Sequence, residues 1–323
     1  MDNTPTSANR NDEVIEVDGV ATRPLAARQP ITPKRDHAGH PSRKPNAGST
    51  SSERKSPGCC DRFMGGLVDL VLTKDEDKLA YLKNYNCMPP PIFILLVSII
   101  ELAIFIYYSV IAETKQWMTL NDALLSSVLI YDPYKREQAW RFISYLLLHA
   151  GIEHIMGNIL LQLVIGIPLE MVHKGLRVGT VYMSGVLAGS LASSMFDPFM
   201  YLVGASGGVY ALIGGYFSNL VMNWSKMAMN GLHLVMVIIL VLVDFAFSIY
   251  RRFVYYPEGG QQVSFVAHLA GGLAGITIGY VVFSNFNKKL SKDPKFWVCL
   301  LSYFGCCAVA VFWNLFLSPV GTI

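Results

Sequence analysis

Charge is scarce over most of this 323-residue sequence: 15% of the residues are charged and 52% are hydrophobic. Residues 1–90 carry 13 of the 26 Lys and Arg and 12 of the 23 Asp and Glu, which leaves 24 charges for the other 233 residues. That remainder is too apolar for two soluble domains and is typical of a membrane protein. The net charge of +3 is too small and too dispersed to indicate a nucleic-acid-binding protein.

Several other features are missing. The first long apolar run begins near residue 91, so we expect no cleavable signal peptide. The acidic cluster at 75–77 lacks the alternating spacing and central Gly of an EF-hand, and no His-Glu-x-x-His occurs. We therefore expect no metal and no cofactor. The cysteines avoid the loops between apolar runs, which excludes a disulfide framework. They are Cys59, Cys60, Cys87, Cys299, Cys306 and Cys307.

The chain divides into three parts. Residues 1–57 are rich in Pro, Ser, Thr, Asn, Arg and Lys without apolar periodicity, which predicts a disordered cytosolic tail. Residues 58–90 form a juxtamembrane segment whose weak amphipathic pattern over 61–85 predicts a short helix. Cys59, Cys60 and Cys87 of this segment lie close to the membrane on the cytosolic side, so reversible palmitoylation of these cysteines remains open. Residues 91–319 form the membrane domain.

Seven apolar runs in this domain are long enough to cross a hydrocarbon core of about 30 Å as helices. They cover approximately 91–112, 150–171, 177–196, 206–223, 232–250, 263–284 and 296–317. We therefore predict an all-α, multi-pass protein of the lipid bilayer. Ten Lys and Arg near the run ends on one side, against six on the other, favour a cytosolic N-terminus and an extracellular or luminal C-terminus.

Three polar clusters interrupt these runs, and each stands at the start of an even-numbered run. They are His149, His154 and Asn158 in the second; Gly204, Ser206, Gly207, Gly208 and Tyr210 in the fourth; and His268, Gly271 and Gly275 in the sixth. At 1.5 Å per residue the clusters reach one depth, roughly 10 Å below the outer surface. The buried irregular segment before the fourth run then needs a wet cavity or a protein environment.

This arrangement predicts a nucleophilic site. Small residues at turn spacing let the fourth and sixth helices approach closely, which would bring the Ser206 hydroxyl within reach of the His268 imidazole. Tyr210, one turn after Ser206, would pack on that ring. His154, Asn158 and the backbone amide of Ser206 would donate to a tetrahedral oxyanion.

The same residues resemble the rhomboid intramembrane serine proteases over about residues 87–319. The resemblance rests on the pair Trp140-Arg141, the His149/His154/Asn158 spacing, Gly-Ala-Ser-Gly at 204–207 and Ala-His-x-x-Gly-x-x-x-Gly at 267–275. It implies a six-helix core with a seventh C-terminal helix, and a Ser206–His268 dyad without an acidic third member. It also implies single-pass membrane proteins as substrates, ectodomain release, and a plasma-membrane or secretory-pathway location.

The sequence also allows functions other than that of an intramembrane serine protease. A catalytically inactive rhomboid-like client-binding protein would be expected to lack the serine or the histidine. A channel or transporter would be expected to have paired half-helices, which the sequence does not indicate. The pattern Gly204-x-Ser206-x-Gly208 also fits a nucleophile elbow, but the strand before it is missing.

For Glu101 and Asp244, inside the first and fifth runs, we expect interhelical hydrogen bonds. Trp140 and Arg141 are expected to support the large loop.

Overall fold

The computed structural model describes residues 90–111, 122–253, 264–283 and 292–320, together with Arg62 and Gly65–Gly66. All of them belong to one compact unit, Lys55–Ile323. The described residues from 90 onward are helical or irregular, apart from one isolated bridge between Tyr131 and Leu202. The predicted tail at 1–57, Cys59, Cys60, Cys87 and most of the predicted helix at 61–85 lie outside the described residues.

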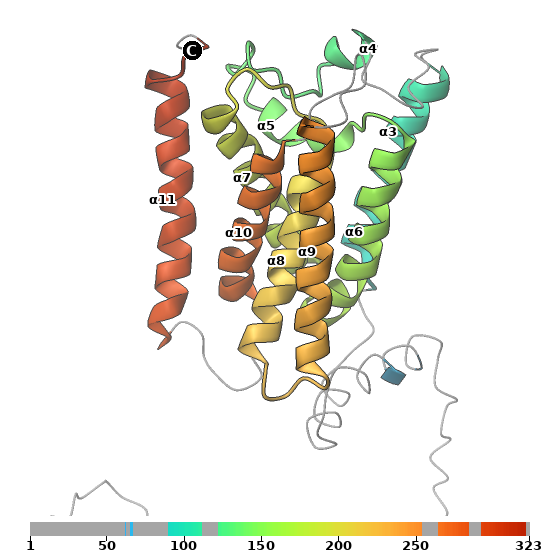
Figure 1. Ribbon diagram of the computed structural model, residues 1–323, viewed down its shortest axis with the longest axis vertical. Coiled ribbons are helices and arrows are strands. Elements are labelled where there is room, and N and C mark those ends of the chain that lie inside the picture. Colours follow the sequence, from blue (N-terminus) through green and yellow to red (C-terminus); the bar gives the residue numbers. More distant parts are fainter. Residues whose placement is uncertain are drawn as a thin grey trace, which may run out of the picture. The chain divides into compact units, whose positions relative to one another are not determined.

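Seven helices of the described chain have 15 residues or more, and they stand side by side in a bundle (Figure 1). They are α3 (Ile92–Ile106), α6 (Ile152–His173), α7 (Gly175–Phe196), α8 (Ser206–Met222), α9 (Asn230–Phe253), α10 (Phe265–Val282) and α11 (Pro294–Phe316). Each corresponds to one predicted apolar run, and the predicted all-α polytopic fold is confirmed. A π-helical turn, Tyr107–Ile111, extends α3. The short helices α4 (Asp122–Leu125) and α5 (Arg141–Ser144) and the 3-10 turn Tyr145–Leu147 precede α6.

Five of these helices are long and apolar enough to cross a membrane by themselves: α3, α6, α9, α10 and α11. The other two, α7 and α8, lie inside the bundle, where 11 of the 22 residues of α7 and 12 of the 17 residues of α8 are buried. Since protein rather than lipid covers most of α8 and half of α7, the covered faces can be rich in Gly and Ser without exposing polar groups to hydrocarbon. The central position of α8 is what places its first residue inside the molecule.

Glycines bring α8 and α10 into backbone contact. A Cβ added at Gly271 would overlap the carbonyl group of Gly207, and one added at Gly275 would overlap the backbone of Ala211. One turn further along, a Cβ at Gly279 would lie 2.9 Å from the Cα of Gly215. Such contacts leave no room for a side chain at these positions unless the two helices move apart. The close approach predicted from the small-residue spacing is therefore confirmed.

Polar side chains also join the helices. The predicted interhelical bonds of Glu101 are confirmed: this fully buried carboxyl group on α3 accepts from the Tyr182 hydroxyl of α7 at 3.0 Å and from Gln162 Nε2 of α6 at 3.3 Å. A second carboxylate was not foreseen as a helix cap. Glu170, near the end of α6, accepts from the amides of Phe93 and Ile94 in the first turn of α3, at 2.8 and 2.9 Å. These amides have no acceptor within their own helix.

The last helix is bound to the rest of the bundle by Asn314. Its Nδ2 donates to Ser194 Oγ of α7 at 2.7 Å, and its Oδ1 accepts from Arg136 Nη1 at 3.2 Å. All three side chains are buried. Arg136 belongs to the loop before α5. Through Asn314, α11 therefore binds both this loop and helix α7.

Candidate active site

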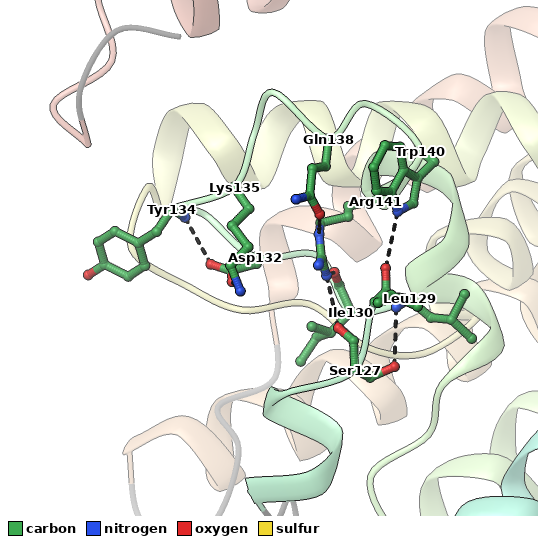
Figure 2. A network of polar contacts seen from close by, with 10 residues as sticks. Ser127, Leu129, Ile130, Asp132, Tyr134, Lys135, Gln138, Trp140 and Arg141 are labelled. Carbon is green, nitrogen blue, oxygen red and sulfur yellow. Dashed lines mark hydrogen bonds and ion pairs between the residues drawn. The ribbon is translucent and has the colours of Figure 1, made fainter.

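The loop before α6 is built around Arg141, which is 3% exposed. Its Nη1 donates to the carbonyl oxygens of Ser127 and Ile130 at 2.9 and 2.8 Å, and its Nε donates to Gln138 Oε1 at 2.7 Å (Figure 2). The neighbouring Trp140 keeps an exposed ring and donates from Nε1 to the carbonyl oxygen of Val128, as Figure 2 also shows in part. Both side chains thus bind backbone of the loop itself, which agrees with the scaffolding role expected for them.

The second half of the segment between α7 and α8, residues 202–205, is irregular but buried. Its Leu202 pairs with Tyr131 of the first loop through two backbone hydrogen bonds of 3.2 Å, and the Gly204 amide donates to the Tyr145 carbonyl at 3.1 Å. The next amide, that of Ala205, donates to His149 Nε2 at 3.4 Å. These bonds satisfy a backbone that would otherwise lose hydrogen bonds in an apolar environment.

Gly204 has a backbone that other residues rarely adopt, with φ of +107°. A Cβ at this position would lie 2.5 Å from Cε1 and Nε2 of the His154 ring. Glycine is therefore needed twice, once for its dihedral angle and once for the ring beside it. The His154 imidazole consequently lies directly against the segment that leads into Ser206.

The two histidines of the first cluster lie together. Their ring centroids are 5.3 Å apart, with the planes at 70°. His149 is 1% exposed, and burial, followed by the charge of His154, holds its pKa well below the usual value. A neutral His149 accepts the Ala205 amide at Nε2. One turn after His154, the buried Asn158 donates from Nδ2 to the His154 carbonyl at 2.8 Å, which leaves its second amide hydrogen for another acceptor.

Ser206 and His268 lie at the starts of the two helices that touch at Gly207 and Gly271, α8 and α10. Ser206 is the first residue of α8 and is half-buried, while His268 lies in the first turn of α10 and is 9% exposed. The contact between Gly207 and Gly271 sets their two helices at the same level. The Tyr210 ring stacks on the His268 ring, with centroids 4.5 Å apart and planes at 17°. Among the described residues no hydrogen bond joins the Ser206 hydroxyl to the imidazole, and catalytic hydrogen bonds often tighten only when substrate binds.

His268 has an acidic neighbour that the sequence did not indicate. Asp244 Oδ2, on α9, lies 3.4 Å from His268 Nδ1 and also accepts from the Tyr210 hydroxyl. The interhelical bonds expected for Asp244 are thus confirmed. The resemblance implied no acidic partner for the histidine, whereas the structure contains one. Nothing in the spacing marks this pair, because Asp244 and His268 lie on different helices with a long segment between them.

No group of three or more His, Cys, Asp or Glu side chains in the described parts of the chain could hold a metal ion. Residues 136–285 match the Rhomboid domain family. Rhomboid-related protein 2 of Mus musculus is 59% identical over 255 residues, which make up 78% of this chain and 84% of that protein. The chain belongs to the rhomboid family.

Two further relatives of this rhomboid protein differ in what their names say. Rhomboid-related protein 3 of Mus musculus is 38% identical over 268 residues, 82% of this chain and 66% of that protein. Inactive rhomboid-related protein 2 of Caenorhabditis elegans is 34% identical over 220 residues, 68% of this chain and 62% of that protein. Membership of the family supports a function of the intramembrane protease type, with membrane proteins as substrates. Because the family includes a member named inactive, activity must be argued from this chain's own residues.

Proposed function

We propose that this rhomboid protein is a serine endopeptidase that cleaves single-pass membrane proteins. The observation that supports the proposal is the glycine contact between α8 and α10, which brings together the two helix starts that carry Ser206 and His268, with Tyr210 stacked on the imidazole. A serine hydroxyl is a weak nucleophile unless a base takes its proton. His268, held by the tyrosine ring at the level of Ser206, is the base that the site offers.

The reaction follows from these positions. Ser206 Oγ attacks the carbonyl carbon of the scissile peptide while His268 Nε2 takes the hydroxyl proton. The tetrahedral intermediate collapses as the imidazolium gives this proton to the leaving amine, and an acyl-enzyme remains. Water, deprotonated by the same imidazole, then attacks the ester and releases the second product with the free hydroxyl of Ser206.

Three donors are available for the negative oxygen of the intermediate. The Ser206 amide is the first of helix α8, where the helix itself provides no acceptor and the helix dipole favours negative charge. The His154 ring lies against Gly204, next to this amide, and Asn158 follows one turn later on α6. Removing one donor of an oxyanion site typically lowers turnover by about 100- to 1000-fold. We assign His154, Asn158 and the Ser206 amide to this role.

The position of Ser206 supports cleavage near the outer end of the substrate helix. Helix α8 has 17 residues, or about 26 Å, against about 30 Å of hydrocarbon and 40–45 Å of whole bilayer. With its C-terminal end at the cytosolic edge of the hydrocarbon core, the helix places Ser206 about 4 Å inside the outer edge of that core, which is roughly 10 Å below the outer headgroup surface. Bonds at that depth become accessible only where the substrate helix unwinds, which Gly, Pro and small polar residues favour.

The orientation and location complete the proposal. The Lys and Arg distribution favours a cytosolic N-terminus and an extracellular or luminal C-terminus, so the product released on the outer side would be shed as an ectodomain. The compartment we assign is the plasma membrane or the secretory pathway.

The test is cleavage of tagged single-pass proteins by the full chain in cells without other rhomboid activity. The wild type should release product, while Ser206→Ala and His268→Ala should release none at equal expression. A fluorophosphonate probe should label the wild type and not Ser206→Ala. Binding of a substrate panel without cleavage or labelling would instead favour the client-binding alternative.

A further inference from the structure

We infer that Asp244 is a positioning residue for His268: it holds the imidazole as the tautomer that can take a proton from Ser206. This inference rests on the proposed function and adds a third residue to its machinery. Its basis is that Asp244 Oδ2 lies 3.4 Å from His268 Nδ1, on a helix that provides neither the serine nor the histidine.

The contacts of Asp244 determine which imidazole nitrogen carries hydrogen. An ionised carboxylate can only accept hydrogen bonds. Asp244 Oδ2 accepts from the Tyr210 hydroxyl and also faces His268 Nδ1. Because the carboxylate has no hydrogen to donate, Nδ1 must carry the proton in this contact. In a neutral imidazole, Nε2 on the opposite side of the ring is then free to accept. The stacked Tyr210 ring opposes rotation of the imidazole out of this orientation.

The carboxylate also suits the charged state of the base. When His268 takes the serine proton it becomes an imidazolium, whose positive charge lies beside Asp244. At this separation, with the imidazole largely buried, opposite charges attract more strongly than they do in solution. Asp244 therefore favours the transition state over the resting state, which is the condition for a contribution to rate.

Fastening α9 to the bundle does not by itself require an acid. Elsewhere on the same helix, His233 Nδ1 pairs with the Tyr216 hydroxyl of α8 at 3.1 Å, without a carboxylate in that contact. An acidic residue within a membrane helix is costly and is usually functional. The Asp244 side chain is one-third exposed, and its remaining contact is the Ser248 hydroxyl of its own helix at 3.5 Å. A neutral side chain could have made the bonds to Tyr210 and Ser248, so the charge is best explained by the imidazole.

The experiment compares Asp244→Asn, which keeps the size and removes the charge, with Asp244→Glu, which keeps the charge. Both are measured in liposomes on a single-pass substrate, with rates expressed per folded enzyme. Loss of the correct tautomer in a serine protease lowers kcat by up to about 10,000-fold. We expect Asp244→Asn to lower kcat by about 100-fold or more with KM changed less than about threefold, and Asp244→Glu to recover at least about tenfold over Asn. A purely structural role gives the reverse order, because Asn is the better steric match.

Asp293→Asn is the matched control. Asp293 also accepts from a tyrosine of α10, Tyr280, at 2.9 Å, but this tyrosine is 12 residues, about 18 Å, from His268. The Asp293→Asn variant should therefore leave kcat unchanged.

Three results overturn the inference while Ser206→Ala is inactive: Asp244→Asn within threefold of wild type, Asn equal to or faster than Glu, or a change in KM alone. Cleavage by Ser206→Ala would instead refute the proposed function itself. If Asp244→Asn does not accumulate, Asp244→Ala replaces it, and a rate equal to that of Glu overturns the inference.

Discussion

The α8–α10 contact allows a sharp comparison between two adjacent glycines. A Cβ at Gly271 would lie 3.0 Å from the carbonyl carbon and 3.1 Å from the Cα of Gly207, and closer still to the carbonyl oxygen. A Cβ at Gly272 would find only Tyr210 Cδ1 and O, at 3.9 and 4.0 Å, which is ordinary contact. Alanine at 271 must therefore push the two helices apart, whereas alanine at 272 fits.

The expected effect is larger on turnover than on stability. Overpacking costs about 1–3 kcal/mol, and replacing a helical Gly by Ala returns about 1 kcal/mol. The net loss for Gly271→Ala is thus about 0–2 kcal/mol. The same displacement, on the order of 1 Å, separates Ser206 from His268, and a misplacement of this size lowers rate by about 100-fold. Gly272→Ala should keep wild-type turnover and equal or higher stability.

The assay measures kcat on a transmembrane substrate in liposomes and thermal unfolding of the same preparations. Gly271→Ala should lose about 100-fold in kcat while its Tm falls by only a few degrees. Wild-type turnover in Gly271→Ala, or equal damage from Gly272→Ala, would show that the glycine contact does not set the distance between serine and base.

Three further predictions concern the surrounding scaffold. Arg141→Ala leaves the buried carbonyl groups of Ser127 and Ile130 without a donor and should lower the free energy of unfolding by about 2–4 kcal/mol. Trp140→Phe removes one exposed hydrogen bond to the Val128 carbonyl and should lower it by less than about 1 kcal/mol, and thermal unfolding compares the two variants. Asn314→Leu should lower Tm through the lost partners of Arg136 and Ser194, and Asn314→Gln should lower it less. Burial and His154 lower the pKa of His149, so the folded protein keeps it neutral while the unfolded chain binds a proton below about pH 6.5; Tm should fall as pH drops below that value, and His149→Gln should flatten the slope.

Sequence reasoning was most successful where a property belongs to one helix. The length of an apolar run predicts a membrane helix. Small residues one turn apart within a helix, such as Gly271 and Gly275, predict a close helix contact, because both properties follow from local geometry. The interior position of α7 and α8 was less evident, since it depends on which neighbours cover them.

Contacts between distant segments were the part that the sequence could not supply. The carboxylate of Glu170 caps a helix that begins 78 residues earlier, and no local pattern specifies that partner. Asp244 could be recognised as an acid that needs a partner in the membrane, but its neighbours Tyr210 and His268 follow only from the packing of three helices. Likewise, Gly204 belongs to a visible glycine-rich cluster, but the ring of His154 that forbids a side chain there becomes apparent only in three dimensions.

The bonds of Asn314 have an evolutionary consequence for the C-terminal helix. Asn314 is the partner of Arg136 in a loop and of Ser194 on α7. The presence of the seventh helix therefore determines which residues are suitable at two positions outside that helix. A lineage that lost α11 would expose a buried guanidinium and a buried hydroxyl, and selection would then favour changes at both sites. Among rhomboid sequences, the residues at these three positions should therefore vary together, and positions 136 and 194 alone should reveal whether a seventh helix follows.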